Sequence, residues 1–170
     1  MIVFRNTGEI AKELGLRKPD ITETEDEGYF GSWFCNVVTV NRRKCLIFCH
    51  ATTLYSFFVP CVTKKEFANF FEVFQINLSA NLEYEGINPT VIRNLLCHYQ
   101  EVVLSKTNNR SVLGSMNDYC YLFGAYVEPG GPQDCDILAV NQKINTAPMS
   151  ALKYSSGVKE MKRMLMRVAI

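Results

Sequence analysis

Residues 30–60 decide the fold, and they read FGSWFCNVVTVNRRKCLIFCHATTLYSFFVP. Three apolar runs within this stretch are rich in β-branched and aromatic residues, the composition typical of strands: Phe30–Val40, Lys44–His50 and Thr53–Val59. Asn41–Arg43 separates the first two runs, as a short hairpin loop would. The stretch therefore predicts successive antiparallel strands at the centre of the fold.

Both faces of this sheet are predicted to be covered. Side chains of a strand alternate between two faces, and in the first run both faces are apolar: Trp33, Cys35 and Val37 on one, and Phe34, Val38 and Val40 on the other. A sheet with one solvated face would alternate apolar with polar residues instead. Met1–Arg5 also has strand character, and Val102–Ser105 is expected to join the sheet. The predicted sheet comprises about residues 30–60 plus 102–105.

Helix signals dominate the rest of the chain. The clearest is a capping box formed by Thr63 and Glu66, which precedes a stripe of phenylalanines beginning at Phe67. Cap residues, apolar spacing and terminal glycines or prolines predict six helices: Asn6 to Gly15, Thr63 to Gly86, Asn88 to Tyr99, Ser111 to Val127, Asp134 to Asn145 and Gly157 to Val168. We therefore expect an α+β fold, with a mainly antiparallel sheet and helices packed on both of its faces.

Length and composition indicate one α+β domain over residues 1–170. A chain of 170 residues has the size of a typical domain, and its 48% of hydrophobic residues supply a core that needs neither disulfides nor metals. Residues 16–28 contain Pro19 and five acidic residues and show no apolar periodicity. This segment is expected to be an exposed acidic loop.

Composition also bounds the compartment and the partners. Eighteen basic and seventeen acidic side chains leave a net charge of +1, which argues against a surface that binds nucleic acid by charge alone. Leu46 to Val62 is the most apolar stretch, but polar residues interrupt it and it is too short to cross a bilayer, so no membrane partner is expected. No secretory signal is recognised, because charged residues occupy Arg5 to Glu13. The seven cysteines are expected to be reduced thiols in the cytoplasm.

The candidate site is the segment Lys106–Asp118, which leads from a strand through a polar turn into a helix. A helix start presents free N–H groups and the positive end of the helix dipole, and it can therefore bind anions. Lys106 and Arg110 would add side-chain donors. The predicted residues of this anion or ligand site are Lys106, Asn109, Arg110, Ser111, Asn117 and Asp118. In the alternative interpretation, Thr107 or Asn109 only caps the helix.

The same segment, KTNNRSVLGSMND at residues 106–118, resembles the signature of an uncharacterised bacterial domain family. A TVNRRK hairpin at residues 39–44 and an NTAPM motif at residues 145–149 accompany the signature, as they do in that family. The resemblance implies a common fold and a common site over nearly the whole chain, and an association with mobile elements. It implies no reaction, substrate or cofactor.

No metal and no cofactor is expected. If Asn41–Arg43 is a three-residue loop, Cys35 and Cys49 oppose each other across the hairpin. A structural zinc site needs four ligands, usually with close-spaced pairs such as CxxC, and the chain contains no CxxC pair. Buried free thiols are therefore the better explanation of the cysteines.

These observations favour a non-enzymatic binding or interaction module, with a small anionic ligand or an unknown protein as its partner and a homodimer left open. The first alternative is a small enzyme acting on a phosphorylated or carboxylated metabolite at the same turn. Adjacent Cys97 and His98 do not indicate a nucleophilic pair, because neighbours on a helix diverge by about 100°. The second alternative is weak nucleic-acid binding through Arg42–Lys44 and the basic face of the last helix.

Overall fold

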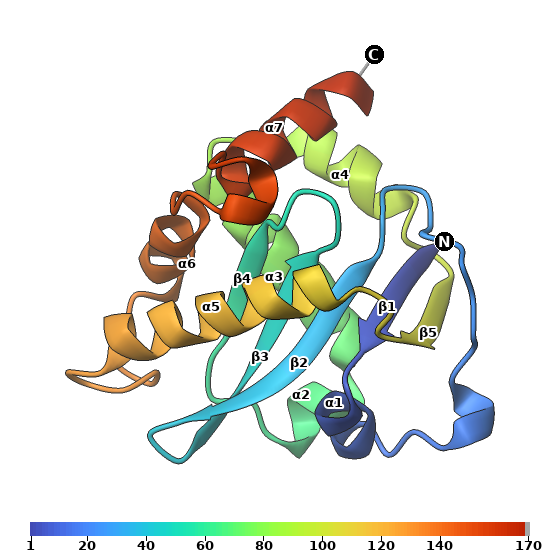
Figure 1. The fold of residues 1–170 in the computed structure, drawn as a ribbon, viewed down its shortest axis with the longest axis horizontal. Helices are drawn as coiled ribbons and strands as arrows, with labels where there is room; N and C mark the ends of the chain where they lie inside the picture. The colour runs from blue at the N-terminus through green and yellow to red at the C-terminus, as the bar shows by residue number, and fades with distance from the viewer. Residues whose placement is uncertain (169–170) are drawn as a thin grey trace.

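The computed structural model describes residues 1–168, and its centre is a five-stranded sheet (Figure 1). The strands are β1 (Ile2–Asn6), β2 (Trp33–Val40), β3 (Arg43–His50), β4 (Ser56–Val59) and β5 (Val102–Lys106). Their order across the sheet is β4-β3-β2-β1-β5. The domain expected over residues 1–170 includes residues 169–170, which lie outside the described part of the chain.

The sheet is mixed, and its antiparallel part is the one predicted from residues 30–60. β2 pairs antiparallel with β3, and β3 pairs antiparallel with β4. β1 instead runs parallel to both of its neighbours, β2 and β5. The α+β class is confirmed. β5 joins the sheet as expected, but it pairs with β1, whose place between β2 and β5 was not predicted.

The β2-β3 hairpin closes with a two-residue turn instead of the three-residue loop considered from the sequence. Asn41 and Arg42 form this turn, with φ angles of 47° and 62°. Positive φ at both central positions is the geometry of a type I′ turn, whose twist matches that of the flanking strands. The shorter turn changes the register, so Cys35 lies opposite Phe48 and not opposite Cys49.

Seven α-helices surround the sheet in the described part of the chain. They are α1 (Gly8–Glu13), α2 (Lys64–Ala68), α3 (Phe70–Tyr84), α4 (Pro89–Cys97), α5 (Arg110–Val127), α6 (Ile137–Asn145) and α7 (Gly157–Val168), with two 3-10 turns, η1 (Lys18–Asp20) and η2 (Ser150–Leu152). Among residues 1–168, none of these helices combines the length and the apolar character needed to cross a membrane.

The helices differ from those predicted at two N-caps and at one interruption, and by one or two residues at the end of α4 and the start of α5. Thr7, and not Asn6, is the N-cap of α1, and Asp136, and not Asp134, is the N-cap of α6. In both helices the cap has extended backbone and its side-chain oxygen accepts a hydrogen bond from a first-turn N–H. The long helix expected after Thr63 is interrupted at Asn69, whose backbone (φ −112°, ψ 34°) is not helical.

Apolar side chains fill both faces of the sheet, as the alternation in β2 predicted. On one face, Trp33 and Cys35 belong to a core completed by α1, α2, α3, α4 and α7. On the other face, Phe34 belongs to a core completed mainly by α5 and α6. Phe123 of α5 stacks on Phe58 of β4 there, with ring centroids 4.1 Å apart. Figure 1 shows α5 lying across β2 and β3 on this second face.

Side-chain amides of α6 pair with the outer edge of β4. Asn145 accepts a hydrogen bond from the Ser56 N–H (2.8 Å) and donates one to the Ser56 carbonyl (2.6 Å). Asn141 does the same at Phe58, at 2.9 and 3.1 Å. The two asparagines are one helical turn apart, and their amides replace a neighbouring strand. Buried backbone groups are thereby satisfied, and the edge is closed to pairing with another chain.

Candidate ligand-binding site

The segment predicted as the site begins at the end of β5 and forms a turn that leads into α5. Asn109 is the N-cap residue of α5, with extended backbone (φ −133°, ψ 107°). Its side-chain oxygen accepts hydrogen bonds from the N–H groups of Ser111 (3.0 Å) and Val112 (3.3 Å). The helix starts at Arg110 because Asn109 satisfies these two first-turn donors. Thr107 and Asn109 were the two candidate caps, and in the structure Asn109 caps the helix.

The structure divides the six predicted residues into two groups. The first group lies at the turn and the start of α5 and comprises Lys106, Asn109, Arg110 and Ser111. The second group is Asn117 and Asp118, which are exposed on the outer face of α5. Asn117 is seven residues after Arg110, which corresponds to about 10 Å along a helix axis. Asn117 and Asp118 are therefore too far from the turn to share one small ligand with the first group.

A buried arginine beneath the turn was not among the predicted residues. Arg5 lies on β1, next to Ser105 of β5, and only 1% of its surface is exposed. Its guanidinium donates four hydrogen bonds, to the carbonyl oxygens of Thr24 (2.7 Å) and Asp26 (2.9 Å), to Ser105 Oγ (3.0 Å) and to Glu27 Oε1 (3.1 Å). Its Nε is buried too and has no partner among the described residues.

A sequence signal for Arg5 did exist. The residue ends an apolar run of strand character, and a charge on a buried strand needs a partner of opposite charge or several hydrogen bonds. Residues 16–28 contain the densest group of acids in the chain and would have been the natural source of that partner. No local pattern joins the strand to the acidic loop, so the sequence alone does not predict their contact.

Glu27 connects Arg5 to the turn. Its carboxylate accepts hydrogen bonds from Arg5 and from the Ser32 hydroxyl, and it lines a cavity together with Asn108 of the turn. Partial burial acts to raise the pKa of Glu27, but the hydrogen bond from Ser32, the charge of Arg5 and the nearby Asn108 amide outweigh it, so the pKa is lowered. Glu27 is thus ionised at neutral pH, and 49% of its side chain remains exposed.

A second ion pair lies at the end of β5. Lys106 Nζ donates to Glu23 Oε1 at 2.8 Å, and both side chains are largely exposed (64% and 79%). The hydrogen bond and the charge of Lys106 lower the pKa of Glu23. The Thr22 N–H also donates to the Leu104 carbonyl of β5 at 2.8 Å. Both cations are therefore paired with carboxylates of one stretch, residues 21–28, which we call the acidic segment.

These contacts hold the acidic segment to the sheet. It contains neither helix nor strand, and in Figure 1 the chain after η1 passes alongside β5 and β1 before it enters β2. Arg5 shares its face of the sheet with Phe34, its register partner on β2. The acidic segment therefore covers the part of the second face that lies beyond α5.

Two cavities flank the Asn108 side chain at the turn. One, of about 240 Å³, is lined by Arg5, Lys106 and Asn108 together with residues of the acidic segment. The other, of about 230 Å³, is lined by Asn108, Asn109 and Glu27, with Thr52 among its further residues. Ammonium, guanidinium and amide donors converge here on carboxylate oxygens. The same donors would hold a phosphate or carboxylate group if those carboxylates moved away.

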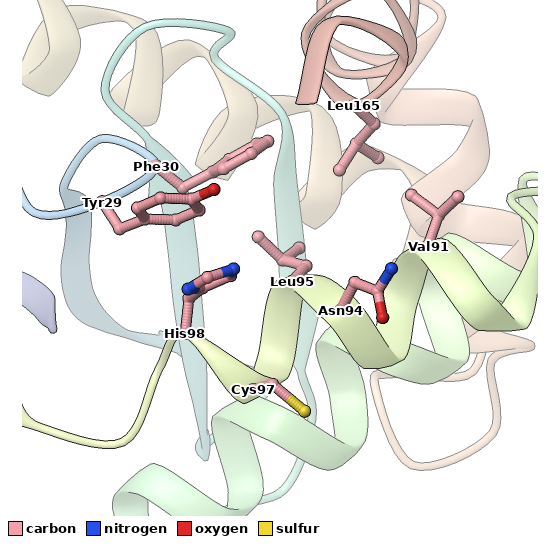
Figure 2. Close-up of a pocket in the computed structure, with 8 residues that line it drawn as sticks. All are labelled: Tyr29, Phe30, Val91, Asn94, Leu95, Cys97, His98 and Leu165. Carbon is pink, nitrogen blue, oxygen red and sulfur yellow. The ribbon is translucent and has the colours of Figure 1, made fainter. Parts of the chain in front are cut away.

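Neither histidine lies in these two cavities. His50 is fully buried, donates from Nε2 to the Phe30 carbonyl (2.6 Å) and accepts at Nδ1 from the Thr53 N–H (3.2 Å). Burial lowers the pKa of His50 to about 4, so the ring is neutral at physiological pH. His98 lines a different cavity, shown in Figure 2. Burial also raises the pKa of Cys49 to about 12, which keeps it a thiol.

The two basic clusters considered for nucleic-acid binding are separate. At the hairpin tip, Arg42–Lys44, the Lys44 ammonium pairs with Glu13. On α7, Arg163 pairs with Glu160 at 2.6 Å. Figure 1 shows the tip of the β2-β3 hairpin and α7 at opposite ends of the molecule. The clusters therefore do not form one continuous surface along which a nucleic-acid backbone could lie.

Comparison with known proteins identifies a family without a known activity. A family model described as "Domain of unknown function (DUF6933)" matches residues 3–160. This span includes every residue of the turn, the acidic segment and β1 from Val3 onward. The match confirms the expected resemblance to an uncharacterised domain family. No curated protein and no solved structure matches the chain.

Proposed function

The chain belongs to the DUF6933 family, and we propose that it is a non-enzymatic binding module for a small anionic ligand. The ligand's phosphate or carboxylate groups would bind at the ends of β1 and β5 and at the start of α5. Lys106, Asn109, Arg110 and Ser111 supply the donors that the sequence predicted, and Arg5 adds a buried guanidinium. The acidic segment occupies this place in the ligand-free protein.

The observation that carries the proposal is the origin of the two carboxylates. Glu27 pairs with Arg5 and Glu23 pairs with Lys106, and both acids come from the acidic segment. Carboxylates of the chain itself thus occupy the positions proposed for the anionic groups of a ligand. Because the Lys106–Glu23 pair is largely exposed, it contributes little to stability, and a ligand can replace it at small cost.

The start of α5 supports the same ligand chemistry. Arg110 is exposed at the first helical position, and its side chain makes no hydrogen bond or ion pair with residues 1–168. The positive end of the helix dipole also favours an anion at this place. A ligand held between Lys106 and Arg110 would gain two charge-assisted contacts. These two contacts break no buried interaction, whereas a contact with Arg5 requires that Glu27 be displaced.

A binding role is favoured over catalysis by the position of the titratable groups. Asp118, the acid expected to line the site, is on the outer face of α5 and cannot reach a ligand at the turn. Of the remaining acids at the turn, Glu27 is held by Arg5 and Ser32 with its pKa lowered, which disfavours a role as proton acceptor.

Calorimetric titration with pyrophosphate tests the proposal. We expect the Lys106→Ala and Arg110→Ala variants to bind pyrophosphate about tenfold more weakly than the wild type, the equivalent of one charge-assisted hydrogen bond each. A Glu23→Gln/Glu27→Gln variant should bind more tightly than the wild type, because both internal competitors have lost their charge. Arg93→Ala removes an exposed cation on α4 and is the matched control, expected to bind as the wild type does.

Two results would overturn the proposal. The first is equal affinity of wild type, Lys106→Ala and Arg110→Ala, which would make the binding non-specific. The second is a Glu23→Gln/Glu27→Gln variant that binds no tighter than the wild type, which would mean that the acidic segment does not occupy the ligand's place.

A protein partner is the second candidate, and the outer face of α5 favours it. Tyr121 on this face is 81% exposed, and Asn117 and Asp118 are exposed beside it. A Cβ added at Gly114 would meet nothing within 4 Å, so the fold itself does not require glycine there. If this face joins two copies of the chain, Tyr121→Glu should abolish dimers in sedimentation velocity, whereas a wild type that sediments as a monomer rules out the homodimer.

We place the protein in the cytoplasm. All seven cysteines are free in the structure, and three of them, Cys35, Cys45 and Cys49, are buried on β2 and β3. Free thiols are typical of reducing compartments. Mass measurement after alkylation in denaturant of protein purified from its host would detect seven free thiols if this assignment is correct.

A further inference from the structure

A third cavity shares no lining residue with the two cavities at the turn. It has a volume of about 200 Å³ and is bounded by α4, by α7 and by the chain just before β2. Figure 2 shows Tyr29 and His98 on one side of it, Val91 and Asn94 on the other, and Leu95 between them.

The inner walls of the cavity are apolar and firmly packed. Phe30, Leu95 and Leu165 line it, and they are only 6%, 4% and 3% exposed. They come from three separate parts of the chain, all of which belong to the core on the first face of the sheet. The apolar base of the cavity therefore exists before any ligand arrives, so little ordering would be needed on binding.

An aromatic pair forms one rim. The rings of Tyr29 and His98 are stacked, with centroids 3.8 Å apart and an angle of 21° between their planes. Tyr29 is 53% exposed, and Figure 2 shows its hydroxyl pointing toward the space above Leu95. The backbone of Tyr29 is held in place by a hydrogen bond, which the Tyr29 N–H donates to the Met1 carbonyl at 3.3 Å.

The opposite rim supplies a side-chain amide. Asn94 is exposed, lines the cavity and makes no side-chain hydrogen bond with the residues that the structure describes. An amide presents a donor and an acceptor side by side, and the same pattern on a ligand would pair with both. No Lys, Arg, Asp or Glu is among the described residues that line the cavity, so a neutral ligand fits it better than a charged one.

The volume limits the ligand to a single ring system. A dry cavity of about 150 Å³ can hold one benzene molecule, whereas pockets for drug-sized ligands have about 300–1,000 Å³. We propose that this cavity binds a neutral, planar heteroaromatic ring of nucleobase size, whose donor–acceptor edge pairs with the Asn94 amide. The ring would lie on Leu95 and contact the Tyr29–His98 pair edge-on or face-on, as aromatic groups do.

An NMR titration of the ¹⁵N-labelled protein with adenine, uracil and nicotinamide tests this inference. We expect at least one of these rings to cause saturable shifts of the amide signals of Tyr29, Asn94, Leu95 and His98. Toluene, which has no hydrogen-bonding edge, serves as the comparison ring. It should bind more weakly than the best heteroaromatic ring, because it leaves the Asn94 amide unpaired.

Three variants make the test specific. Asn94→Leu keeps the size of the side chain. It should lower the affinity for the best-binding ring by about three- to tenfold, the equivalent of one hydrogen bond. Val91→Phe places an extra ring at the mouth of the cavity and should abolish binding. Arg93→Leu changes the exposed neighbour of Asn94 and should leave binding unchanged.

The inference is overturned if none of the three heteroaromatic rings shifts these signals at millimolar concentration. It is also overturned if toluene binds as tightly as they do, or if Asn94→Leu binds as well as the wild type. None of these outcomes depends on pyrophosphate binding, so the two proposed sites can fail or stand separately.

Discussion

Replacing Asn145 by leucine should destabilise the protein strongly, although the two side chains have nearly the same size. Asn145 is fully buried and makes three hydrogen bonds: it accepts from the Ser56 N–H at 2.8 Å and donates to the Ser56 carbonyl at 2.6 Å and to the Asn141 carbonyl at 2.9 Å. Leucine fills the space but cannot pair with any of these groups. The N–H and carbonyl of Ser56, which is itself fully buried, would lose these partners.

The expected loss follows from those two backbone groups. A buried polar group left without a partner costs about 1–3 kcal/mol, so two of them should lower the free energy of unfolding by about 2–6 kcal/mol. In a domain of this length, a loss of that size lowers Tm on the order of 10 °C. Packing adds little, because Asn145→Leu creates no cavity.

Urea denaturation followed by circular dichroism measures this loss. Asn117→Leu is the matched control, since it makes the same change at an exposed position of α5 and should stay within about 0.5 kcal/mol of the wild type. Hydrogen exchange should also become faster at the Ser56 amide of β4. An Asn145→Leu variant as stable as the control would refute the view that α6 substitutes for a neighbouring strand.

Three further predictions concern charge and backbone geometry. Burial lowers the pKa of His50 from 6.5 to about 4, so the unfolded chain binds a proton before the folded protein does as pH falls. Urea titrations should therefore show about 3 kcal/mol of the free energy of unfolding lost between pH 6.5 and pH 4. His50→Gln should reduce this dependence of stability on pH. Because the pKa of Glu27 is lowered, the wild type should have a higher free energy of unfolding than Glu27→Gln above pH 4.5. This difference should shrink as pH falls through the lowered pKa. A difference that does not change with pH would contradict the pairing of Glu27 with Arg5. Arg42→Gly, at φ 62° in the hairpin turn, should raise the free energy of unfolding by about 0.5–1 kcal/mol, and a loss would contradict the type I′ turn.

Local patterns predicted most of the secondary structure. The apolar runs of residues 30–60 became β2, β3 and β4, and the capping box at Thr63 did begin a helix. These signals act between near neighbours, where hydrogen-bonding and side-chain spacing are visible in the sequence. Errors of one or two residues at the caps of α1 and α6 arose where adjacent polar residues compete for the same capping position.

Contacts between distant segments were harder to predict. The position of β1 between β2 and β5 depends on two parallel pairings, and neither is encoded by a turn. The burial of Arg5 depends on the acidic segment, whose lack of periodicity suggested only an exposed loop. Both features come from packing that joins separate stretches of sequence, and local propensity has no information about such packing.

The candidate site shows the same limit. The turn and its Asn109 cap were recognisable from the run of residues 106–118. Helical spacing put Asn117 and Asp118 on the same side of α5 as Arg110, but the rise along the helix axis already separates Asn117 from Arg110 by about 10 Å. This part of the prediction could therefore have been corrected from the sequence. The cavity beside Tyr29 and Asn94 had no motif at all, because it forms where three elements meet.

Hydrogen–deuterium exchange with and without pyrophosphate tests the central claim most directly, namely that the acidic segment occupies the place of an anionic ligand. If it does, saturating pyrophosphate will speed the exchange of backbone amides in residues 22–28, including Thr22, whose N–H is bonded to β5. Exchange at the start of α5 will slow at the same time. Unchanged or slower exchange throughout residues 22–28 at saturation would contradict the account, because the ligand would then bind without displacing the segment.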